Sequence, residues 1–308
     1  FGDFAVWKRE TQRVDDDATS VEYWRSRLRG LPALDLPTDS PRPRFTTSAG
    51  AFQQMELSTD LLEGVERLSR ELETTPFVVL LAAFDVLLHT YSRQHDFAVG
   101  VPLSTRPSAD LEAVIGSFLN VLVLRATIAD AESFRSLVIQ QREAMLDAAA
   151  HQEVPFEQLV LLADQERDTS RTPLVQVLFT VQNAPGQTEV FEGLQVLPIA
   201  LARRTAQYEL SMHEHGRTVY LEFNTDLFSP ETAASLLAQY AGIVERSVSD
   251  PQAPIDALAQ VSAIEKAQLE AWNATAQAYP AEATLPAVFA AQIPALSVVV
   301  HPTDELQV

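Results

Sequence analysis

Cysteine is absent from the 308 residues, and positively charged residues are scarce. Without thiols the protein forms no disulfide, no thiolate nucleophile and no Cys-ligated metal site, which is compatible with a cytoplasmic location. Lys and Arg total 22 against 42 Asp and Glu, giving a formal net charge of −20. Because this charge repels nucleic-acid phosphates and anionic membrane surfaces, we expect no nucleic-acid partner and no membrane partner.

Long apolar segments are also missing. The longest apolar run, residues 77–84, reaches about half of the roughly 18 residues that a membrane-spanning helix needs. The first residues, Phe1-Gly2-Asp3-Phe4, have neither an initiator Met nor a basic region before an apolar one, so we expect that they are not a signal peptide. We interpret this start as a cut inside a longer chain.

Motifs for several common chemistries do not occur. The sequence contains no Gly-x-Ser-x-Gly elbow, no Gly-x-Gly-x-x-Gly fingerprint and no Walker-type phosphate loop. His213 and His215 share a strand face, but no third ligand stands beside them at metal-site spacing, so we expect a polar strand face and no metal. His89 lies in an apolar segment, where a core or helix-end position explains it better than a role as a base.

What the sequence does contain is a mixture of helical and strand patterns. Apolar residues at helical spacing, with caps such as Ser58 and Ser229, predict helices over 59–73, 76–92, 132–150 and 230–248. Runs of β-branched and aromatic residues predict strands over 51–57, 96–101, 121–128, 174–182, 207–214 and 218–224. The expected fold class is α/β or α+β, with helices packed on a mostly buried sheet.

Proline and turn residues mark the connections. Residues 31–48 and 183–189 are predicted to be exposed loops. From about Val261 the strand pattern gives way to an alanine-rich, helix-like run over 264–274 and then to several prolines, which indicates an interdomain linker.

Short motifs follow one another in a fixed order over residues 1 to about 260. Phe1–Trp7, which contains Asp3 and Trp7, is similar to a Tyr-x-Asp-Phe-Ala-x-Trp segment, and Ile115–Asn120 to Ile-Gly-x-Phe-Val-Asn, with leucine in place of valine. The other matching positions are Tyr23-Trp24, 36–39, 41–43, 99–102, Arg106, 124–125, 151–160, 167–174, 179–183 and 224–228. In this order the motifs resemble the condensation domains of nonribosomal peptide synthetases, and most closely those that join two L-configured residues.

This resemblance implies a fold and a reaction. Condensation domains consist of two chloramphenicol-acetyltransferase-like subdomains with a tunnel between them, in which a transferase reaction forms peptide bonds during natural-product biosynthesis. Both substrates arrive on the phosphopantetheine arms of carrier proteins. The family's His-His-x-x-x-Asp-Gly motif occurs nowhere in this sequence. We therefore expect a C-terminal subdomain with helices on a mixed β-sheet, no catalytic residue in this chain, no directly bound cofactor, and no transfer activity of the chain by itself.

The resemblance also implies domain boundaries and partners. Residues 1–20 would end the N-terminal subdomain, 21–260 would form the C-terminal subdomain, 261–285 the linker to an adenylation domain, and 286–308 the start of that domain or an unrelated tail. The implied partners are the N-terminal subdomain, the upstream and downstream peptidyl carrier proteins, and the adenylation domain. A second class of function also fits, namely a noncatalytic condensation-like module that recruits a carrier protein or a tailoring enzyme.

Four residues are expected to support the tunnel. Arg106 matches the arginine that, in the family, pairs with the aspartate of the missing motif across the subdomain boundary; the alternative is a solvated loop arginine. Gly116 and Asn120 match positions where the family's chain passes near the catalytic centre, since glycine permits close approach and an amide both donates and accepts. A strand-edge or turn cap is the alternative for Asn120. Asn183 matches a position near the tunnel, although Asn-Ala-Pro is also a good loop start.

The other motif residues are assigned to structure. We expect Trp24 to be buried, His151 to cap the preceding helix, and Pro155 to start a short helix. Asp3 and Trp7 belong to the first motif and are assigned no chemistry.

Charged residues of the later motifs and of the first hundred residues are expected to act locally. The set Arg167, Asp168 and Arg171 is predicted to form ion pairs before the strand that follows. The set Arg25, Arg27 and Arg29 is either a solvated helix face or a contact for an acidic carrier protein. A missing subdomain is also expected to leave an exposed apolar face and to cause self-association.

Overall fold

The computed structural model describes residues 1–14, 18–104, 106, 109–129, 131–163, 168–181, 204–260, 263–276 and 283–292. The chain divides into two compact units, Phe1–Ser262 and Ala263–Val308. The second unit contains α9 (Ala263–Asn273) and α10 (Leu285–Gln292). The first unit contains the sheet and the candidate site.

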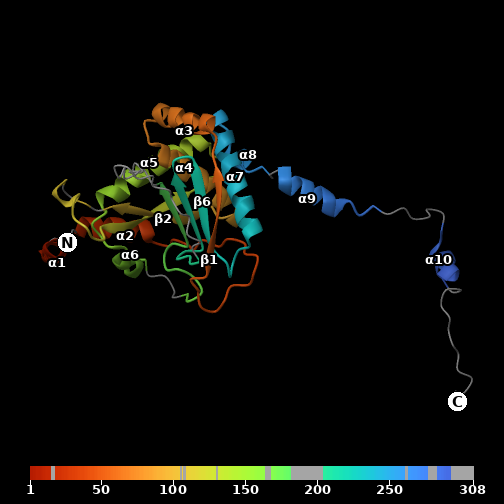
Figure 1. The fold of residues 1–308 in the computed structure, drawn as a ribbon, viewed down its shortest axis with the longest axis horizontal. Helices are drawn as coiled ribbons and strands as arrows, with labels where there is room; N and C mark the ends of the chain where they lie inside the picture. Colours follow the sequence, from red (N-terminus) through yellow and green to blue (C-terminus); the bar gives the residue numbers. More distant parts are fainter. Residues whose placement is uncertain are drawn as a thin grey trace, which may run out of the picture. The chain divides into compact units, whose positions relative to one another are not determined.

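A six-stranded mixed sheet forms the centre of the first unit (Figure 1). The strands are β1 (Gly50–Glu56), β2 (Asp96–Ser104), β3 (Leu119–Thr127), β4 (Val177–Val181), β5 (Leu210–His215) and β6 (Thr218–Asn224). Their order is β1-β6-β5-β4-β2-β3; β2, β4 and β5 are parallel, and the other neighbouring pairs are antiparallel. All six strands overlap the predicted ranges, so the predicted fold class is confirmed.

Four long helices pack around this sheet. In Figure 1, α4 (Pro76–Ser92) lies between α5 (Phe134–Ala150), which packs on β3, and α7 (Pro230–Ser249), which packs on β1 and β6. α3 (Thr59–Glu71) packs on α4 and α7. Each helix follows its predicted range. Ser58, Ser133 and Ser229 cap three of them, because each hydroxyl accepts a hydrogen bond from the backbone N–H three residues later.

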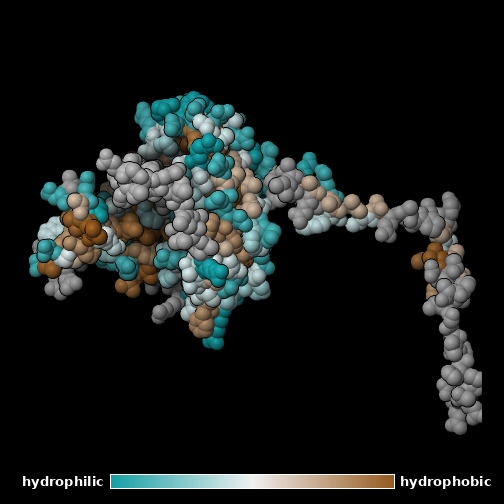
Figure 2. All heavy atoms as spheres, viewed as in Figure 1, coloured by the Kyte–Doolittle hydropathy of each residue, from teal (hydrophilic) through white to brown (hydrophobic). Residues whose placement is uncertain are grey.

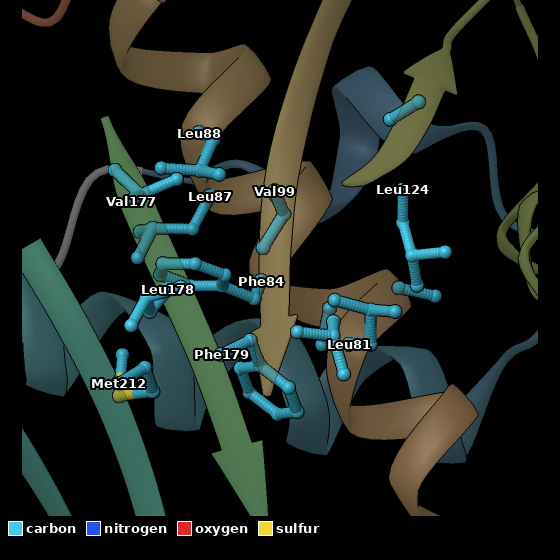
Figure 3. Packing of buried hydrophobic residues seen from close by; sticks show 14 of the residues in the cluster. Leu81, Phe84, Leu87, Leu88, Val99, Leu124, Val177, Leu178, Phe179 and Met212 are labelled. Atoms are coloured by element: carbon cyan, nitrogen blue, oxygen red, sulfur yellow. The ribbon is translucent and has the colours of Figure 1, made fainter. Parts of the chain in front are cut away.

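Helix α4 forms the centre of the hydrophobic core. Its residues Val78 to His89 are all buried, which explains why the helix is apolar on every side. Figure 3 shows Phe84 and Phe179 of β4 close together, and their ring centroids are 5.5 Å apart. Among the described residues no single helix is long and apolar enough to cross a membrane, although α3 and α4 taken together meet the same criteria across a 106° bend.

Four further helices and a 3-10 turn complete the described part of the first unit. They are α1 (Gly2–Val14), α2 (Ala18–Leu28), α6 (Phe156–Leu162), α8 (Ile255–Leu258) and a 3-10 turn at Ala109–Leu111. Pro155 directly precedes α6, where the sequence predicted a short helix. α2 and α6 pack against each other, and α6 also packs on β3.

The segment 31–48 differs from its prediction as an exposed loop. Leu31, Leu34 and Leu36 are buried in the hydrophobic core. The backbone of Leu34 is held on both sides, since its N–H donates to Gln176 Oε1 at 2.8 Å and its carbonyl accepts from Arg171 Nη1 at 2.7 Å. The prolines prevent regular secondary structure here, but the intervening leucines contribute apolar surface that is buried. The second predicted loop, 183–189, lies outside the described residues.

Candidate functional site

One edge of the sheet collects most of the residues that the sequence singled out. The carboxyl ends of the parallel strands β2, β4 and β5 lie at this edge, and β3 starts beside the end of β2. Arg106 follows β2, Gly116 lies in the connection to β3, and Asn120 pairs with Leu103 in the β2–β3 register. The fourth predicted residue, Asn183, follows β4 and lies outside the described residues.

Arg106 is held in a defined position. Its Nη1 donates to the carbonyl of Leu111 and, at 3.0 Å, to the carbonyl of Val114. Its guanidinium carbon lies 4.0 Å from the centroid of the Phe118 ring, a cation–π geometry. The side chain is half-buried. Arg106 is therefore an ordered residue that closes its own loop and not a freely solvated one; its pairing with an aspartate of another segment stays a prediction.

An aromatic cluster also contacts Phe118. The rings of Phe4 and Phe1 lie 4.7 Å and 5.3 Å from it, and Trp7 lies 5.7 Å from Phe4. Gly116 makes this approach possible, because a Cβ atom at that position would come within 2.2 Å of the Phe1 ring. The cluster Phe1, Phe4, Trp7 and Phe118 therefore joins α1 to the loop that carries Arg106.

Apolar side chains remain uncovered around this cluster. Ile115 is 95% exposed and Leu119 is 70% exposed, whereas Phe118 between them is only 4% exposed. Val6 and Trp7 of α1, and Phe1 directly before it, are about half exposed. In Figure 2, hydrophobic surface is visible on the side of the first unit where α1 lies. We call the residues Phe1, Val6, Trp7, Ile115 and Leu119 the apolar rim.

Asn120 fastens β3 to the corner between α5 and α6. Its Nδ2 donates to the carbonyls of Gln152 and Val154, each at 2.9 Å. Its Oδ1 accepts from the backbone N–H groups of Val121 and Phe156, each at 3.0 Å. Both donors and both acceptor positions of the amide are thus occupied by backbone. This geometry supports the strand-edge alternative, in which Asn120 positions the surrounding chain.

Trp24 and His151 join α2 to the same corner. Trp24 is fully buried, and its Nε1 donates to the carbonyl of His151 at 2.9 Å. His151 is the C-cap residue of α5; its Nδ1 lies 2.8 Å from Ser20 Oγ, and its ring stacks on Tyr23 at 4.3 Å. These contacts confirm that His151 caps the end of α5, and they give it a structural role in holding α2.

The ion pair predicted between Asp168 and Arg171 is present, with 3.4 Å between Arg171 Nε and Asp168 Oδ2. Arg171 also pairs with Asp35 and donates to Leu34, so it connects this loop to the buried segment 31–36. Arg167 lies outside the described residues.

The basic residues of α2 have mixed environments. Arg25 pairs with Glu22 at 2.6 Å on the surface. The carbonyls of Arg27 and Arg29 accept hydrogen bonds from Arg125, at 2.9 Å and 3.0 Å, which ties the end of α2 to β3. The suggested contact with an acidic carrier protein stays a prediction.

Glu214 is a buried titratable residue at the site edge that the sequence analysis missed. It lies near the carboxyl end of β5, is 7% exposed, and its Oε2 has no hydrogen-bond partner within the described part of the chain. Burial raises its pKa from 4.5 to about 7. The alternation of side chains along the predicted strand could have indicated this burial, since Glu214 shares a strand face with the buried Leu210 and Met212.

No feature of the described residues suggests a bound metal. Among them no group of three His, Asp or Glu side chains is placed to hold an ion. A small apolar pocket of about 20 Å³ lies between α4 and α7, with Leu88, Tyr91, Phe228 and Leu236 in its wall. Since this volume holds about one water molecule, the pocket has no room for a substrate. What the described residues build at the sheet edge is an ordered, partly apolar surface.

Known proteins share both sequence and fold with this chain. Residues 1–270 match the family model of the condensation domain. One of the linear gramicidin synthase proteins of Brevibacillus parabrevis is 36% identical over 299 residues, which cover 94% of this chain and only 4% of that protein. Tyrocidine synthase 3 of the same organism is 33% identical over 298 residues, which cover 95% of this chain and 5% of that protein. The chain thus corresponds to a small part of each of these relatives.

Two solved structures show the same fold. The chain matches holo-AB3403, a four-domain nonribosomal peptide synthetase bound to AMP and glycine, with a TM-score of 0.78 and 24% identity, over 91% of this chain and 23% of that one. It matches the X-domain from teicoplanin biosynthesis with a TM-score of 0.74 and 24% identity, over 82% of this chain and 60% of that one. Since the family model covers most of the chain and the fold agrees, the protein belongs to the condensation-domain family of nonribosomal peptide synthetases.

Proposed function

We propose that this chain is the C-terminal part of a condensation domain that forms amide bonds between carrier-bound thioesters. In this reaction the acceptor amine attacks the carbonyl carbon of the donor thioester, the carbon–sulfur bond breaks, the donor thiol leaves, and the nitrogen gives up a proton. Hydrogen-bond donors stabilise the oxyanion that forms on the carbonyl oxygen. Because the sequence contains no His-His-x-x-x-Asp-Gly motif, we propose that the histidine comes from the N-terminal subdomain.

The observation that carries this proposal is the apolar rim beside the ordered Arg106. A contiguous exposed apolar surface marks a contact site, and aromatic and arginine residues are enriched in the centres of protein interfaces. Here Ile115 and Leu119 are exposed by 95% and 70% next to a guanidinium that already has a fixed position. Such a surface fits a second subdomain, with the tunnel between the two.

The substrates and partners follow from the same proposal. We propose that acyl and aminoacyl groups enter on phosphopantetheine arms of upstream and downstream carrier proteins, without a cofactor held by this chain, and that an adenylation domain is a further partner. The match to a four-domain synthetase supports this arrangement. The proposed location is the cytoplasm, with which a sequence without cysteine is compatible.

Reconstitution in two parts tests the proposal. The upstream segment of the same gene is produced as a separate polypeptide, mixed with this chain, and assayed by mass spectrometry for amide formation between two loaded carrier proteins. We expect product only when both polypeptides are present, and none when the histidines of the upstream motif are changed to alanine. A stable complex of the two that forms no product contradicts the proposal.

A noncatalytic recruitment module is the second candidate. One solved neighbour, the X-domain of teicoplanin biosynthesis, has been determined as a complex with OxyB, so a domain of this fold can hold another protein. A degenerate upstream motif, together with a stable complex between this chain and a tailoring enzyme of the same pathway, would favour this candidate over amide formation.

A further inference from the structure

Arg106 has hydrogen-bond donors that nothing in the described part of the chain satisfies. Both hydrogen bonds of its guanidinium come from Nη1, to the carbonyls of Leu111 and Val114. Nε and Nη2 have no such partner among the described residues. A guanidinium presents a planar fork that matches a carboxylate in bidentate geometry. Within the described part of the chain, the guanidinium of Arg106 is therefore bound at Nη1, while Nε and Nη2 can still donate to a further acceptor.

Phe118 determines where this fork lies. Its ring faces the guanidinium carbon at 4.0 Å, so the ring plane restricts rotation of the long arginine side chain. Phe118 is itself immobilised, because it is 4% exposed and contacts Phe4 at 4.7 Å and Phe1 at 5.3 Å. The aromatic residues at the start of α1 thus contact Phe118, and Phe118 in turn contacts Arg106.

The surroundings of Phe118 show that its burial is specific. Its neighbours Ile115 and Leu119 are 95% and 70% exposed, so Phe118 points inward between two apolar residues that remain exposed. Gly116 provides the space for Phe1 on this inner side. The buried ring of Phe118 therefore contacts the guanidinium of Arg106 as well as the rings of Phe1 and Phe4.

We infer that Phe118 is a positioning residue for Arg106, and that α1 sets the position of Phe118 through Phe1 and Phe4. This inference rests on the proposed function, in which a second subdomain covers the surface beside Arg106; there the guanidinium fork would bind a carboxylate of that subdomain. Holding the guanidinium in place before the partner arrives removes the cost of ordering it during binding. Phe118 thereby strengthens a contact that it does not make itself.

The first test measures the affinity of this chain for the separately produced upstream segment. Phe118→Leu keeps an apolar side chain but removes the ring, whereas Phe118→Tyr keeps the ring. We expect Phe118→Leu to weaken binding about 3- to 30-fold, the range of a cation–π contact, and Phe118→Tyr to bind like the unchanged chain. Arg106→Ala should also weaken binding, and the double variant should lose no more than the single Arg106→Ala variant.

A matched control comes from another arginine–phenylalanine pair of the chain. Arg44 lies 5.5 Å from the Phe45 ring centroid, in the segment before β1. Phe45→Leu should leave the affinity unchanged. If Phe118→Leu binds as tightly as the unchanged chain while Arg106→Ala binds more weakly, the inference is wrong. If the two losses simply add, Phe118 acts independently of Arg106, and the inference is also wrong.

A second measurement needs no partner. In the isolated chain, the NMR order parameter of the Arg106 Nε–H bond reports how firmly the guanidinium is held. We expect it to be high in the unchanged chain and in Phe118→Tyr, and to fall in Phe118→Leu at a temperature at which this variant is still fully folded. If the unchanged chain binds no upstream segment, the proposed function fails, yet this order parameter still decides the inference. A mobile Arg106 in the unchanged chain would overturn it.

Discussion

Arg42 and Glu209 form a bidentate ion pair, with 2.7 Å between Nη1 and Oε1 and 2.8 Å between Nη2 and Oε2. The carboxylate belongs to the residue before β5 and is almost completely buried, whereas Arg42 comes from the segment 31–48. Two parallel charge-assisted hydrogen bonds fix both distance and orientation. The pair therefore attaches the proline-rich segment to the start of a central strand.

Removing Arg42 should destabilise the protein. Arg42→Ala leaves the Glu209 carboxylate buried without its partner, and we expect a loss of about 2–4 kcal/mol in the free energy of unfolding, measured by chemical denaturation. The matched control is Arg217→Ala, because Arg217 and its partner Glu56 are both more than half exposed at 3.4 Å. An exposed pair contributes about 0–1 kcal/mol. Equal effects of the two variants would contradict the role given to the Arg42–Glu209 pair.

Replacing Asn120 even by the isosteric aspartate should destabilise the protein. Asn120→Asp keeps the two acceptor contacts but turns a negative charge toward the carbonyls of Gln152 and Val154, which now receive hydrogen bonds at 2.9 Å. We expect a loss of about 1–3 kcal/mol, the cost of unsatisfied buried groups, and NMR shift changes at the His151 corner. Gln54→Glu, at an exposed position of β1, is the control. A destabilisation no larger than that of the control would contradict the fastening role of Asn120.

The sequence predicted the regular elements well because their signals are local. Apolar periodicity lies within the helix that it predicts, and a cap such as Ser229 directly precedes that helix. The buried segment around Leu34 was missed because its partners, Gln176 and Arg171, are more than 130 residues away in sequence. The position of Arg106 over Phe118 was missed for a related reason, since it depends on α1 packing on the same ring.

Glu214 should make stability depend on pH. Its pKa is about 7 in the folded protein against 4.5 as the usual value, so between these values the folded state holds a proton that the unfolded state has released. Stability is therefore full below about pH 4.5 and falls as the pH rises toward 7. At about 1.4 kcal/mol for each pH unit, the loss at pH 8 amounts to ~3 kcal/mol, taken as an upper bound.

The substitution Glu214→Gln should remove this loss of stability at high pH, because glutamine carries no titratable proton. We expect the variant to be more stable than the unchanged chain at pH 8 and to approach it at pH 5, as measured by urea denaturation across this range. Tyr240 of α7 lies close enough for the charge of Glu214 to raise its pKa, in addition to the larger effect of burial. Glu143→Gln, on an exposed face of α5, is the control. A difference between unchanged chain and variant that is the same at pH 5 and pH 8 would contradict the assignment.

Ile115 of the apolar rim should control self-association without contributing to folding. Ile115 is 95% exposed, so Ile115→Glu removes little buried surface, and we expect the free energy of unfolding to change by less than about 0.5 kcal/mol. The added charge should nevertheless reduce self-association in analytical ultracentrifugation and weaken binding to the upstream segment, because both use the same uncovered surface. Phe45→Glu is the control, since Phe45 is also exposed but precedes the amino end of β1, away from the site edge. Two results together would show that the rim is no contact surface. The unchanged chain would stay monomeric at all concentrations, and the Ile115→Glu variant would bind the upstream segment as tightly as the unchanged chain.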